Sequence, residues 1–358
     1  MSLDNIVLHQ RSQMKGTNSV RTKDTYVLTE VGWRPLFTVE VGDHIFSYTE
    51  EGNLDLDQVV GVVNTEEPLV NYNHSFWGFE VGKSHTWLGY RRMTLTDNKR
   101  VHIWDRRGYG KLSCEFHILN SPSNYYNNKV NLITPDECSL LGWLLSDGCI
   151  SWSKDTKRTS SSNGKRRGVV AGVTQNDNKH GAEIKELMLR LGGFSAAYIK
   201  PNTPNICRHY TLKSDWFREY WEHLGFQQQG KFSINLVKFL LEQPTENVEA
   251  FMEAFQKADG HYSRQGKKVL TQNESNLSEG IFTAAYLLGY NPSSGSKGYY
   301  QNSTGKINKC MWYKLQTKPH QTAMRLLSEE GSRGLCTTLK LKKSTCFVAR
   351  QNDFITLI

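Results

Sequence analysis

An internal repeat in the second half is the feature that most constrains the fold of this 358-residue chain. Three sequence similarities occur there in the same order: residues 140–148 with 252–260, 174–176 with 271–273, and 205–210 with 308–313. Both members of the first pair are helix-compatible runs that end in Asp-Gly, and the second departs from the apolar character of the first at Gln256-Lys257. The repeat predicts a duplicated unit of helix, two strands, helix, two strands and helix.

Hydrophobic periodicity separates this region from the one before it. Residues 20–118 show short apolar runs broken by Gly, Asp and Asn, which predicts an all-β region. Apolar residues recur at helical spacing over 184–191, 217–224 and 248–255. Strand-like runs lie between these helices, at 167–175, 195–200, 206–213, 267–273 and 307–316. We therefore expect an α+β protein.

The net charge of +9 is concentrated in one part of the chain. Residues 1–118 hold 13 Lys and Arg against 15 Asp and Glu, and the remainder holds 31 against 20. A basic excess of this kind suggests a polyanion partner, nucleic acid first and an acidic membrane surface second. A merely soluble basic surface is the alternative.

The cellular setting is expected to be intracellular, with no membrane partner. No run approaches the ~18 apolar residues of a transmembrane helix, and residues 1–19 lack the apolar core of a secretory signal. The seven cysteines form no Cys-x-x-Cys pair, which indicates reduced thiols rather than disulfides or a zinc site.

The two Asp-Gly pairs suggest a metal site. Asp147 and Asp259 stand at helix C-termini, where an anion is disfavoured by ~0.3–1 kcal/mol. Gly148 and Gly260 are expected to cap these helices in the left-handed conformation. Mg²⁺ or another divalent cation would make the aspartates favourable, because hard cations prefer carboxylate, water and phosphate oxygens. A simple helix stop is the alternative.

The two helices are suited to packing against each other. Residues 140–145 are apolar on nearly all sides, which predicts full burial. Gly142 and Ala254 occupy matching positions and would let the two backbones approach closely. Packing about a pseudo-twofold axis would bring Asp147 and Asp259 together, where bound metal ions could serve both strands of a duplex. We expect a monomer with internal pseudo-twofold symmetry.

Segments 142–148 and 254–260 resemble the paired motifs of single-chain LAGLIDADG homing endonucleases, and the resemblance extends over roughly 130–330. It implies two saddle-shaped sheets along the major groove of double-stranded DNA, with metal-dependent double-strand cleavage at their centre. Asp147 and Asp259 match the family's catalytic metal-binding acids, with Gly148 and Gly260 beside them.

The same resemblance suggests further catalytic residues. Gln175 and Gln272 match the polar residues that the family often places at strand ends beside the scissile phosphates. Lys231 resembles the active-site lysine, which would polarise water or stabilise developing phosphorane charge. A solvated loop lysine is the alternative for Lys231. For the second repeat, Lys340 and Arg333 both remain candidates.

Candidate DNA contacts follow from strand alternation and from a basic loop. Polar and apolar residues alternate over 312–318, so the polar set would share one face of the sheet. Residues 154–167 read as a basic surface loop. A merely solvated sheet face would look similar. The candidate DNA-binding residues are Lys213, Trp312, Lys314, Gln316, Lys318, Arg166 and Arg167.

The flanking β segments resemble a different family. Residues 24–45 are similar to the opening of a Hint domain, the fold of inteins, and 346–356 to its closing strands. The resemblance implies a duplicated αββαββα endonuclease domain inserted into an all-β Hint domain. The expected boundaries are an N-terminal flank at 1–19, Hint segments at 20–118 and 335–358, and the endonuclease at 119–334.

The splicing residues of that family are only partly matched. Ser19 is the nearest candidate nucleophile, and His85 matches the histidine of the second splicing motif. Gly82 stands where a threonine is usual, and no terminal His-Asn pair precedes Ile358. We therefore expect an endonuclease that does not splice. The alternatives are a splicing-active intein and a non-catalytic nucleic-acid binder or maturase on the same fold.

Overall fold

The computed structural model divides the chain into two compact units. The first comprises residues 1–126, 285–295 and 313–358, and the second comprises 127–284 and 296–312. The structure describes residues 18–48, 53–74, 77–94, 100–108, 116–119, 124–125, 132–152, 168–199, 207–227, 231, 233–262, 268–273, 275–301, 307–316, 320–322, 327–351 and 354–358. Of the expected N-terminal flank, only Asn18 and Ser19 are among them.

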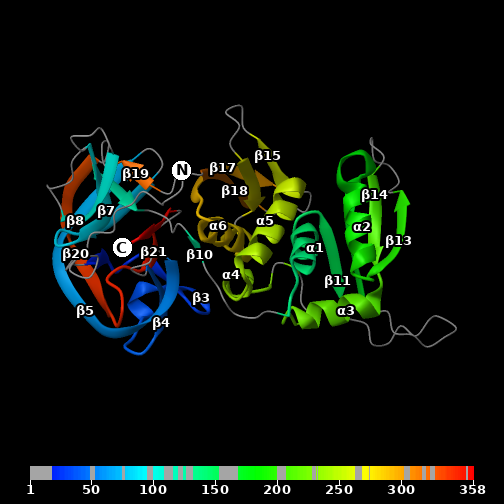
Figure 1. Cartoon of the computed structure of the whole chain (residues 1–358), viewed down its shortest axis with the longest axis horizontal. Helices are drawn as coiled ribbons and strands as arrows, with labels where there is room; N and C mark the ends of the chain where they lie inside the picture. Colours follow the sequence, from blue (N-terminus) through cyan, green and yellow to red (C-terminus); the bar gives the residue numbers. More distant parts are fainter. Residues whose placement is uncertain are drawn as a thin grey trace. The chain divides into compact units, whose positions relative to one another are not determined.

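The first unit is built on a ten-stranded sheet (Figure 1). Its main path runs β20-β1-β6-β5-β4-β2-β21-β22, with β3 paired to β2 and β10 paired to β5. The strands are β1 (Val20–Arg21), β2 (Thr25–Thr29), β3 (Gly32–Pro35), β4 (His44–Tyr48), β5 (Asn53–His74), β6 (Trp77–Gly82), β10 (Asn124–Tyr125), β20 (Leu327–Leu341), β21 (Val348–Gln351) and β22 (Phe354–Leu357). A 3-10 turn, η3 (Leu36–Thr38), follows β3.

The two ends of the chain share this sheet. Val20 is opposite Thr337, and Thr25 is opposite Gln351, so segments more than 300 residues apart are neighbouring strands. The side chain of Asn18 extends the pairing, because its Nδ2 donates to the Leu339 carbonyl at 2.9 Å and its Oδ1 accepts from the Leu339 amide at 3.1 Å. The early and late β segments therefore form one structure.

A smaller four-stranded sheet has the order β19-β9-β7-β8. Its strands are β7 (Thr86–Thr94), β8 (Arg100–Gly108), β9 (Phe116–Leu119) and β19 (His320–Thr322). Trp87, at the start of β7, is fully buried and meets the rings of Tyr72 and Phe79 edge-on, at 5.4 Å and 6.4 Å between centroids. Such aromatic pairs stabilise a core beyond the area they bury.

Two further sheets have one topology, β11-β12-β14-β13 and β15-β16-β18-β17. In each copy the order along the chain is helix, two strands, helix, two strands, as the repeat predicts. Among the described residues, the predicted closing helix occurs in the first copy only. The first copy contains α1 (Pro135–Leu145), β11 (Gly148–Trp152), β12 (Val169–Asn176), α2 (Ala182–Arg190), β13 (Phe194–Ile199) and β14 (Cys207–Leu212). The second contains α5 (Thr245–Asp259), β15 (Gly260–Tyr262), β16 (Lys268–Asn273), α6 (Asn276–Leu287), β17 (Asn291–Gln301) and β18 (Ile307–Gln316).

Additional short elements distinguish the first copy. A π-helix, η4 (Asp177–Gly181), precedes α2, and α3 (Ser214–His223) closes the copy. The helix α4 (Leu236–Leu241) then leads into α5. No helix occurs after β18 among the residues that the structure describes there. Within the described part of the chain, no helix is long and apolar enough to span a membrane.

Helix α1 packs against α5 in the core of the second unit (Figure 1). It begins with a capping box, in which Thr134 and Glu137 satisfy each other's backbone amides, and Pro135 occupies the first turn. Residues 140–145 are all buried, as predicted. A Cβ on Gly142 would lie 2.6 Å from the Phe251 carbonyl oxygen and 2.9 Å from the Ala254 Cβ. The predicted close approach of the two backbones is therefore confirmed.

Candidate active site

The two Asp-Gly helices end differently. Helix α5 continues to Asp259, whereas α1 ends at Leu145 and Asp147 lies in the following turn. The Ser146 hydroxyl donates to the carbonyl oxygens of Gly142 at 2.8 Å and Trp143 at 3.2 Å. Such local side-chain bonds compete with continued helix. Ala258, the equivalent residue in α5, has no hydroxyl to do this.

The expectation of left-handed glycine caps is wrong for both pairs. Gly260 is extended, with φ −92° and ψ 158°, and Gly148 is not among the glycines with positive φ. Each glycine instead begins a strand, Gly260 directly after α5 and Gly148 after the two-residue turn that follows α1. A Cβ on Gly148 would collide with the Leu144 backbone, and one on Gly260 with Gln256. Close approach, rather than backbone conformation, therefore explains the glycines.

Asp147 and Asp259 have matching strand-end partners. The Gln175 side-chain amide donates to Asp147 Oδ2 at 2.9 Å, and the Gln272 amide donates to Asp259 Oδ2. The backbone amide of Thr174 also donates to the Asp147 carbonyl at 3.3 Å, which ties β12 to the turn. Each glutamine thus hydrogen-bonds the carboxylate of its own repeat, and the repeat alignment pairs the two glutamines.

The two carboxylates influence each other electrostatically. Burial, followed by the Asp147 charge, raises the pKa of Asp259 to about 6. Burial also raises the pKa of Asp147, but the charges of Lys179 and Lys231, the Gln175 bond and His180 oppose the rise. A divalent cation bound between two half-buried carboxylates would relieve the repulsion between them.

Lys231 lies beside the turn that carries Asp147. Its Nζ donates to the Ser146 carbonyl at 3.0 Å and to the Gly148 carbonyl at 2.9 Å, on either side of Asp147. Burial lowers the pKa of Lys231, and the charges of Asp259, Cys149 and Asp147 oppose that change. The side chain is half-buried and bonded to the backbone, so it is not the solvated loop lysine of the alternative interpretation.

The carboxylate pair fits an ion that keeps most of its ligands outside the protein. Among the described residues, no group of three or more His, Cys, Asp and Glu side chains is arranged to hold a metal. Two carboxylates supplemented by water and phosphate oxygens suit Mg²⁺, which dehydrates reluctantly. A closed zinc site, in contrast, requires four protein ligands.

The other candidate residues are placed as follows. Lys213 precedes α3, and its Nζ donates to the Gly192 carbonyl at 3.0 Å. Trp312, Lys314 and Gln316 are on β18, but their side chains lie outside the described residues, as do Lys318, Arg166 and Arg167 entirely. Lys340 and Arg333 are on β20 in the sheet of the first unit.

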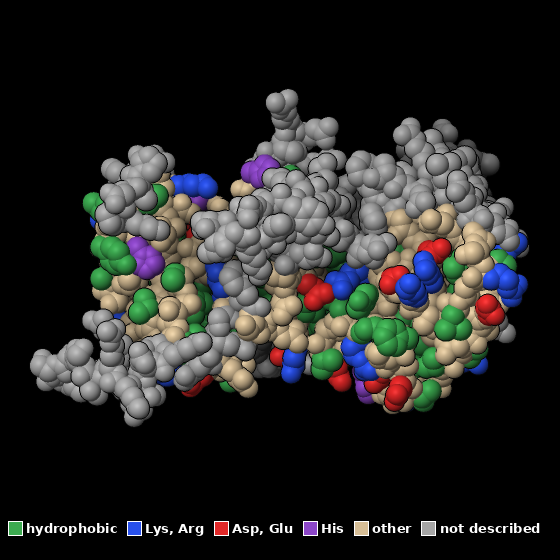
Figure 2. Space-filling model, turned by 180° about the vertical axis from the view of Figure 1, so that it is seen from behind, with side chains coloured by type: hydrophobic (Ala, Val, Ile, Leu, Met, Phe, Trp, Pro, Cys, Tyr) green, Lys and Arg blue, Asp and Glu red, His purple; other side chains and the backbone are tan. Residues whose placement is uncertain are grey.

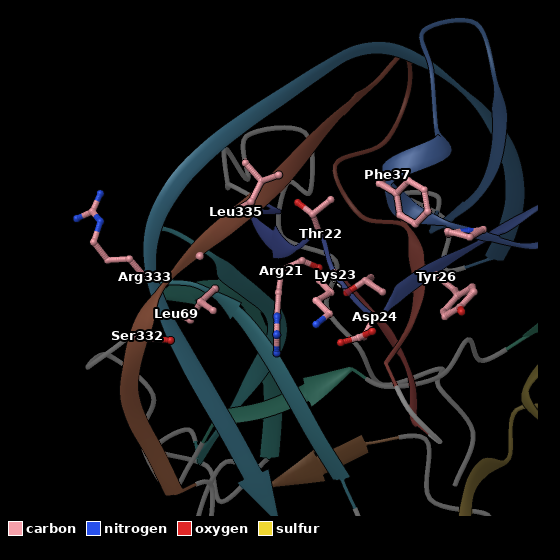
Figure 3. Close-up of a pocket in the computed structure, with 13 residues that line it drawn as sticks. Arg21, Thr22, Lys23, Asp24, Tyr26, Phe37, Leu69, Ser332, Arg333 and Leu335 are labelled. Carbon is pink, nitrogen blue, oxygen red and sulfur yellow. Dashed lines mark hydrogen bonds between the residues drawn. The ribbon is translucent and has the colours of Figure 1, made fainter.

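Arg333 also borders a pocket of about 500 Å³ in the first unit. Figure 3 shows its side chain extending away from the pocket, while Arg21, Lys23 and Asp24 lie at the centre of the view. Arg21 pairs with Glu80, and the Arg333 guanidinium donates to the Glu66 carbonyl at 2.8 Å. On the face seen in Figure 2, this unit shows cationic and anionic side chains interspersed. The guanidinium groups of Arg21 and Arg333 are thus each bonded to an acceptor of the protein itself.

The two splicing candidates are buried near each other. Ser19 and His85 are each 1% exposed. The Ser19 hydroxyl donates to the Glu67 carboxylate, and the Ser19 carbonyl accepts from the Gly82 amide at 3.2 Å. The His85 amide donates to the Gly82 carbonyl at 2.9 Å, so one turn joins the two residues.

Sequence reasoning missed a cluster of charges beside Asp147. Lys179, from η4, donates to the Lys257 carbonyl at 3.4 Å. Lys257 in turn binds Glu183 at 2.7 Å and Glu253 at 3.0 Å. The only available signal was the departure of Gln256-Lys257 from the apolar character of the first motif.

Comparison with known proteins gives a weak structural likeness. No protein-family model and no curated protein matches the chain. A structure of I-DmoI in complex with DNA and calcium is 13% identical, covers 51% of this chain and 83% of that one, and has a TM-score of 0.34. Structures of mesophilic variants of the homing endonuclease I-DmoI are also 13% identical, covering 51% and 88%, with a TM-score of 0.34. We base the proposed function on the site itself.

Proposed function

We propose that this protein is a site-specific DNA endonuclease that makes metal-dependent double-strand breaks. The observation that carries the proposal is the pair of half-buried, mutually repelling carboxylates, Asp147 and Asp259, brought by two copies of one fold to the ends of packed helices. Two equivalent acids related by an internal repeat suit a substrate with two equivalent reacting strands. The basic excess after residue 118 supports a polyanionic substrate.

The cation in this proposal is Mg²⁺ or another divalent ion. Asp147 and Asp259 would hold it, with the backbone at Gly148 and Gly260 beside them. When bound, it would supply positive charge at the phosphate and a more acidic water. Gln175 and Gln272 fix the carboxylate oxygens by hydrogen bonds. Lys231 fixes the turn around Asp147 and adds a positive charge where negative charge develops.

The sheets and the boundaries are part of the proposal. The sheets of the two copies would lie along the DNA, with contacts from Lys213 and from the polar set on β18 and in the 154–167 loop. The expected domain limits at 119 and 334, the monomeric state and the Hint resemblance of the β segments likewise remain proposals. The comparisons do not bear on the Hint resemblance.

The test is a cleavage selection from a randomised plasmid library with Mg²⁺, followed by assays on the selected duplex. Asp147→Asn and Asp259→Asn should each lower the rate of double-strand cleavage by at least about 10²-fold, because each removes a charged ligand of the cation that would act on the reacting phosphate. Asp215→Asn is the matched control, since this carboxylate of α3 is strongly exposed. The proposal fails if both site variants cut as fast as the control.

A non-catalytic binder would behave differently in the same experiment. It would enrich no cleaved plasmid with Mg²⁺, Mn²⁺ or Ca²⁺, but would retain duplexes from the same library in a binding assay. Chelation by EDTA provides the complementary measurement. An endonuclease should lose cleavage in EDTA and regain it with Mg²⁺, whereas activity that persists in EDTA contradicts the proposed use of a cation.

The arrangement around Ser19 supports a second candidate function, self-processing at the Asn18–Ser19 bond. The Ser19 hydroxyl is buried against a carboxylate, and one turn links it to His85. Incubation with hydroxylamine followed by mass spectrometry would detect release of residues 1–18, and Ser19→Ala is the control. An intact mass for the unmodified chain under these conditions contradicts this second function.

A further inference from the structure

Gln256 of α5 carries a buried amide that no other described residue bonds. Its Nε2 and Oε1 atoms are both buried, and neither has a hydrogen-bond partner in the described part of the chain. Burying a polar group without a partner costs free energy, so native proteins rarely retain one without a bound molecule or a functional reason. The equivalent residue of the first copy is Leu144, which is fully buried and apolar. The second copy thus keeps an amide where its own repeat shows that an apolar side chain fits.

The Gln256 amide lies directly beside the residue that follows Asp259. A Cβ built on Gly260 would overlap the Nε2 and Cδ atoms of the Gln256 side chain, besides its backbone oxygen. At Gly148, in contrast, the nearest atoms all belong to the Leu144 backbone. Helix α5 packs against β15 and β16, the strands that follow it (Figure 1). The Gln256 side chain therefore occupies the space that a side chain at position 260 would fill.

The strand register puts this amide on the same face of the sheet as Gln272. Gly260 is opposite Leu270 of β16, and opposite residues of paired strands share a face. Gln272, two residues beyond Leu270, shares that face too, and its amide donates to Asp259 Oδ2. Two glutamine amides therefore lie on one face beside the Asp259 end of α5. One is bonded to the carboxylate, and the other has no partner among the described residues.

We propose that Gln256 is a positioning residue for the divalent cation, its amide hydrogen-bonding a water molecule of the cation's hydration shell at Asp259. This inference rests on the proposed endonuclease function, which supplies the cation. Mg²⁺ keeps several waters when one or two carboxylates bind it. Those waters are hydrogen-bond donors, and a carboxamide oxygen accepts. Outer contacts of this kind change metal affinity by about 10–100-fold.

A neutral amide suits this place better than a third carboxylate would. Asp147 and Asp259 already supply two negative charges, and burying a further charge costs more than burying a neutral polar group. The amide also has a donor beside its acceptor, so it can bind water through either atom. Gln256 therefore holds a water of the ion without adding to the repulsion between the two aspartates.

The test compares Gln256→Met with Gln243→Met. Methionine keeps the length of the side chain and removes both polar atoms. Gln243 is the matched control because it is a buried glutamine whose amide is bonded, donating to the Phe239 carbonyl at 3.3 Å and accepting from the Asn247 amide at 3.1 Å. In EDTA, Gln256→Met should melt at or above the wild-type temperature, whereas Gln243→Met should melt about 2–4 °C lower.

Mg²⁺ titrations then measure the proposed contact itself. The dissociation constant for Mg²⁺ without DNA, measured by titration calorimetry, should rise about 10–100-fold in Gln256→Met and stay within about twofold of the wild type in Gln243→Met. The Mg²⁺ concentration for half-maximal cleavage of the selected duplex should shift by the same factors. Gln256→Glu keeps an acceptor oxygen, so its Mg²⁺ affinity should fall by less than about threefold although it melts lower in EDTA.

Three results would count against the inference. Mg²⁺ dependences of binding and cleavage that are the same in Gln256→Met and the wild type overturn it. A melting temperature of Gln256→Met in EDTA that falls as far as that of Gln243→Met also overturns it, because the amide would then be bonded within the protein. Both results leave the endonuclease proposal intact if Asp259→Asn still loses cleavage. A wild-type protein that binds no Mg²⁺ and cuts no duplex overturns both.

Discussion

The two copies of the repeat share a scaffold but not an electrostatic environment. Their sheets have the same strand order, and each places a glutamine on the aspartate that follows its opening helix. The charges of Lys179, Lys231 and His180 lower the pKa of Asp147. Lys231 is the cation that lowers the pKa of Asp259, which the Asp147 charge raises. The two copies therefore share a strand order but differ in the charges around their aspartates.

Buried positions at the helix interface tolerate less change than surface positions near the site. Gly142 and Ala254 meet at the helix interface, so a larger side chain there would separate the helices. Lys179 and Asn276 are paired by the alignment of residues 174–176 with 271–273, and both lie at the surface. Substitution there costs little folding free energy. The four predictions below run from the largest expected effect to the smallest, and each tests whether the copies act together or separately.

The Lys231 charge acts on both aspartates, so Lys231→Met should have the largest effect. Its charge lowers the pKa of both aspartates, and its Nζ holds the carbonyls on either side of Asp147. We expect cleavage of both strands to slow by about 10²–10³-fold, or about 3–4 kcal/mol of transition-state stabilisation. Single-turnover cleavage rates, measured on a duplex with a different label on each strand, test this expected slowing.

The control for Lys231→Met is Lys238→Met, which removes an exposed lysine of α4. Thermal unfolding of both variants shows whether loss of the two carbonyl bonds unfolds the protein instead. If only one strand slows in Lys231→Met, the lysine belongs to one copy and is not shared.

The helix interface should respond next most strongly. Alanine normally stabilises a helix by about 1 kcal/mol relative to glycine, but the Gly142→Ala Cβ would lie 2.6 Å from the Phe251 carbonyl oxygen. We expect Gly142→Ala to lower the free energy of unfolding by about 3 kcal/mol. Ala254→Gly, the partner position, should cost only about 1 kcal/mol. Urea unfolding followed by circular dichroism measures both, and equal effects would contradict a tight contact at Gly142.

Several parts of this arrangement were predictable from sequence because they are local or repeated. Burial of residues 140–145 follows from their uniformly apolar character, and the pairing of Gln175 with Gln272 follows from the repeat. Gly192 and Gly289 lie just after α2 and α6 with φ of 74° and 75°, the left-handed conformation that glycine favours after a helix end.

The unpredicted parts depend on contacts between distant residues. Lys257 and Glu183 are 74 positions apart, and no local pattern relates them. The caps at Gly148 and Gly260 were mispredicted because each glycine is the first residue of a strand, which a sequence stop signal does not specify. The return of β20, β21 and β22 to the first sheet was suggested only by resemblance to a known fold.

The pH dependence of stability should reveal the cost of burying Asp259 and, after it, the repulsion by Asp147. The folded pKa of Asp259 is about 6, above its ordinary value of 3.8, so the folded state binds this proton more tightly than the unfolded state. Stability from this group is therefore fully present below the ordinary pKa and is lost as pH rises through about 6. The raised pKa of Asp147 acts in the same direction.

Asp259→Asn should accordingly stabilise the metal-free protein by about 1 kcal/mol at neutral pH and have little effect near pH 4. Melting temperatures in EDTA, compared with the wild type across roughly pH 4 to 8, measure the difference. Added Mg²⁺ should raise the wild-type melting temperature at neutral pH and leave an Asp147→Asn/Asp259→Asn double variant unchanged. A variant that is less stable than the wild type at neutral pH would contradict the cost of holding a buried Asp259 charge beside Asp147.

The ion cluster between the copies should have the smallest effect on stability. Glu183→Gln removes the pairs with Lys257 and His180, but Glu253 still binds Lys257 at 3.0 Å. Partly exposed pairs contribute little, so we expect a loss of about 0.5 kcal/mol that disappears at about 1 M salt. Urea unfolding at two salt concentrations measures it. A loss above about 2 kcal/mol, independent of salt, would mean that this cluster joins the copies as firmly as the helix interface does.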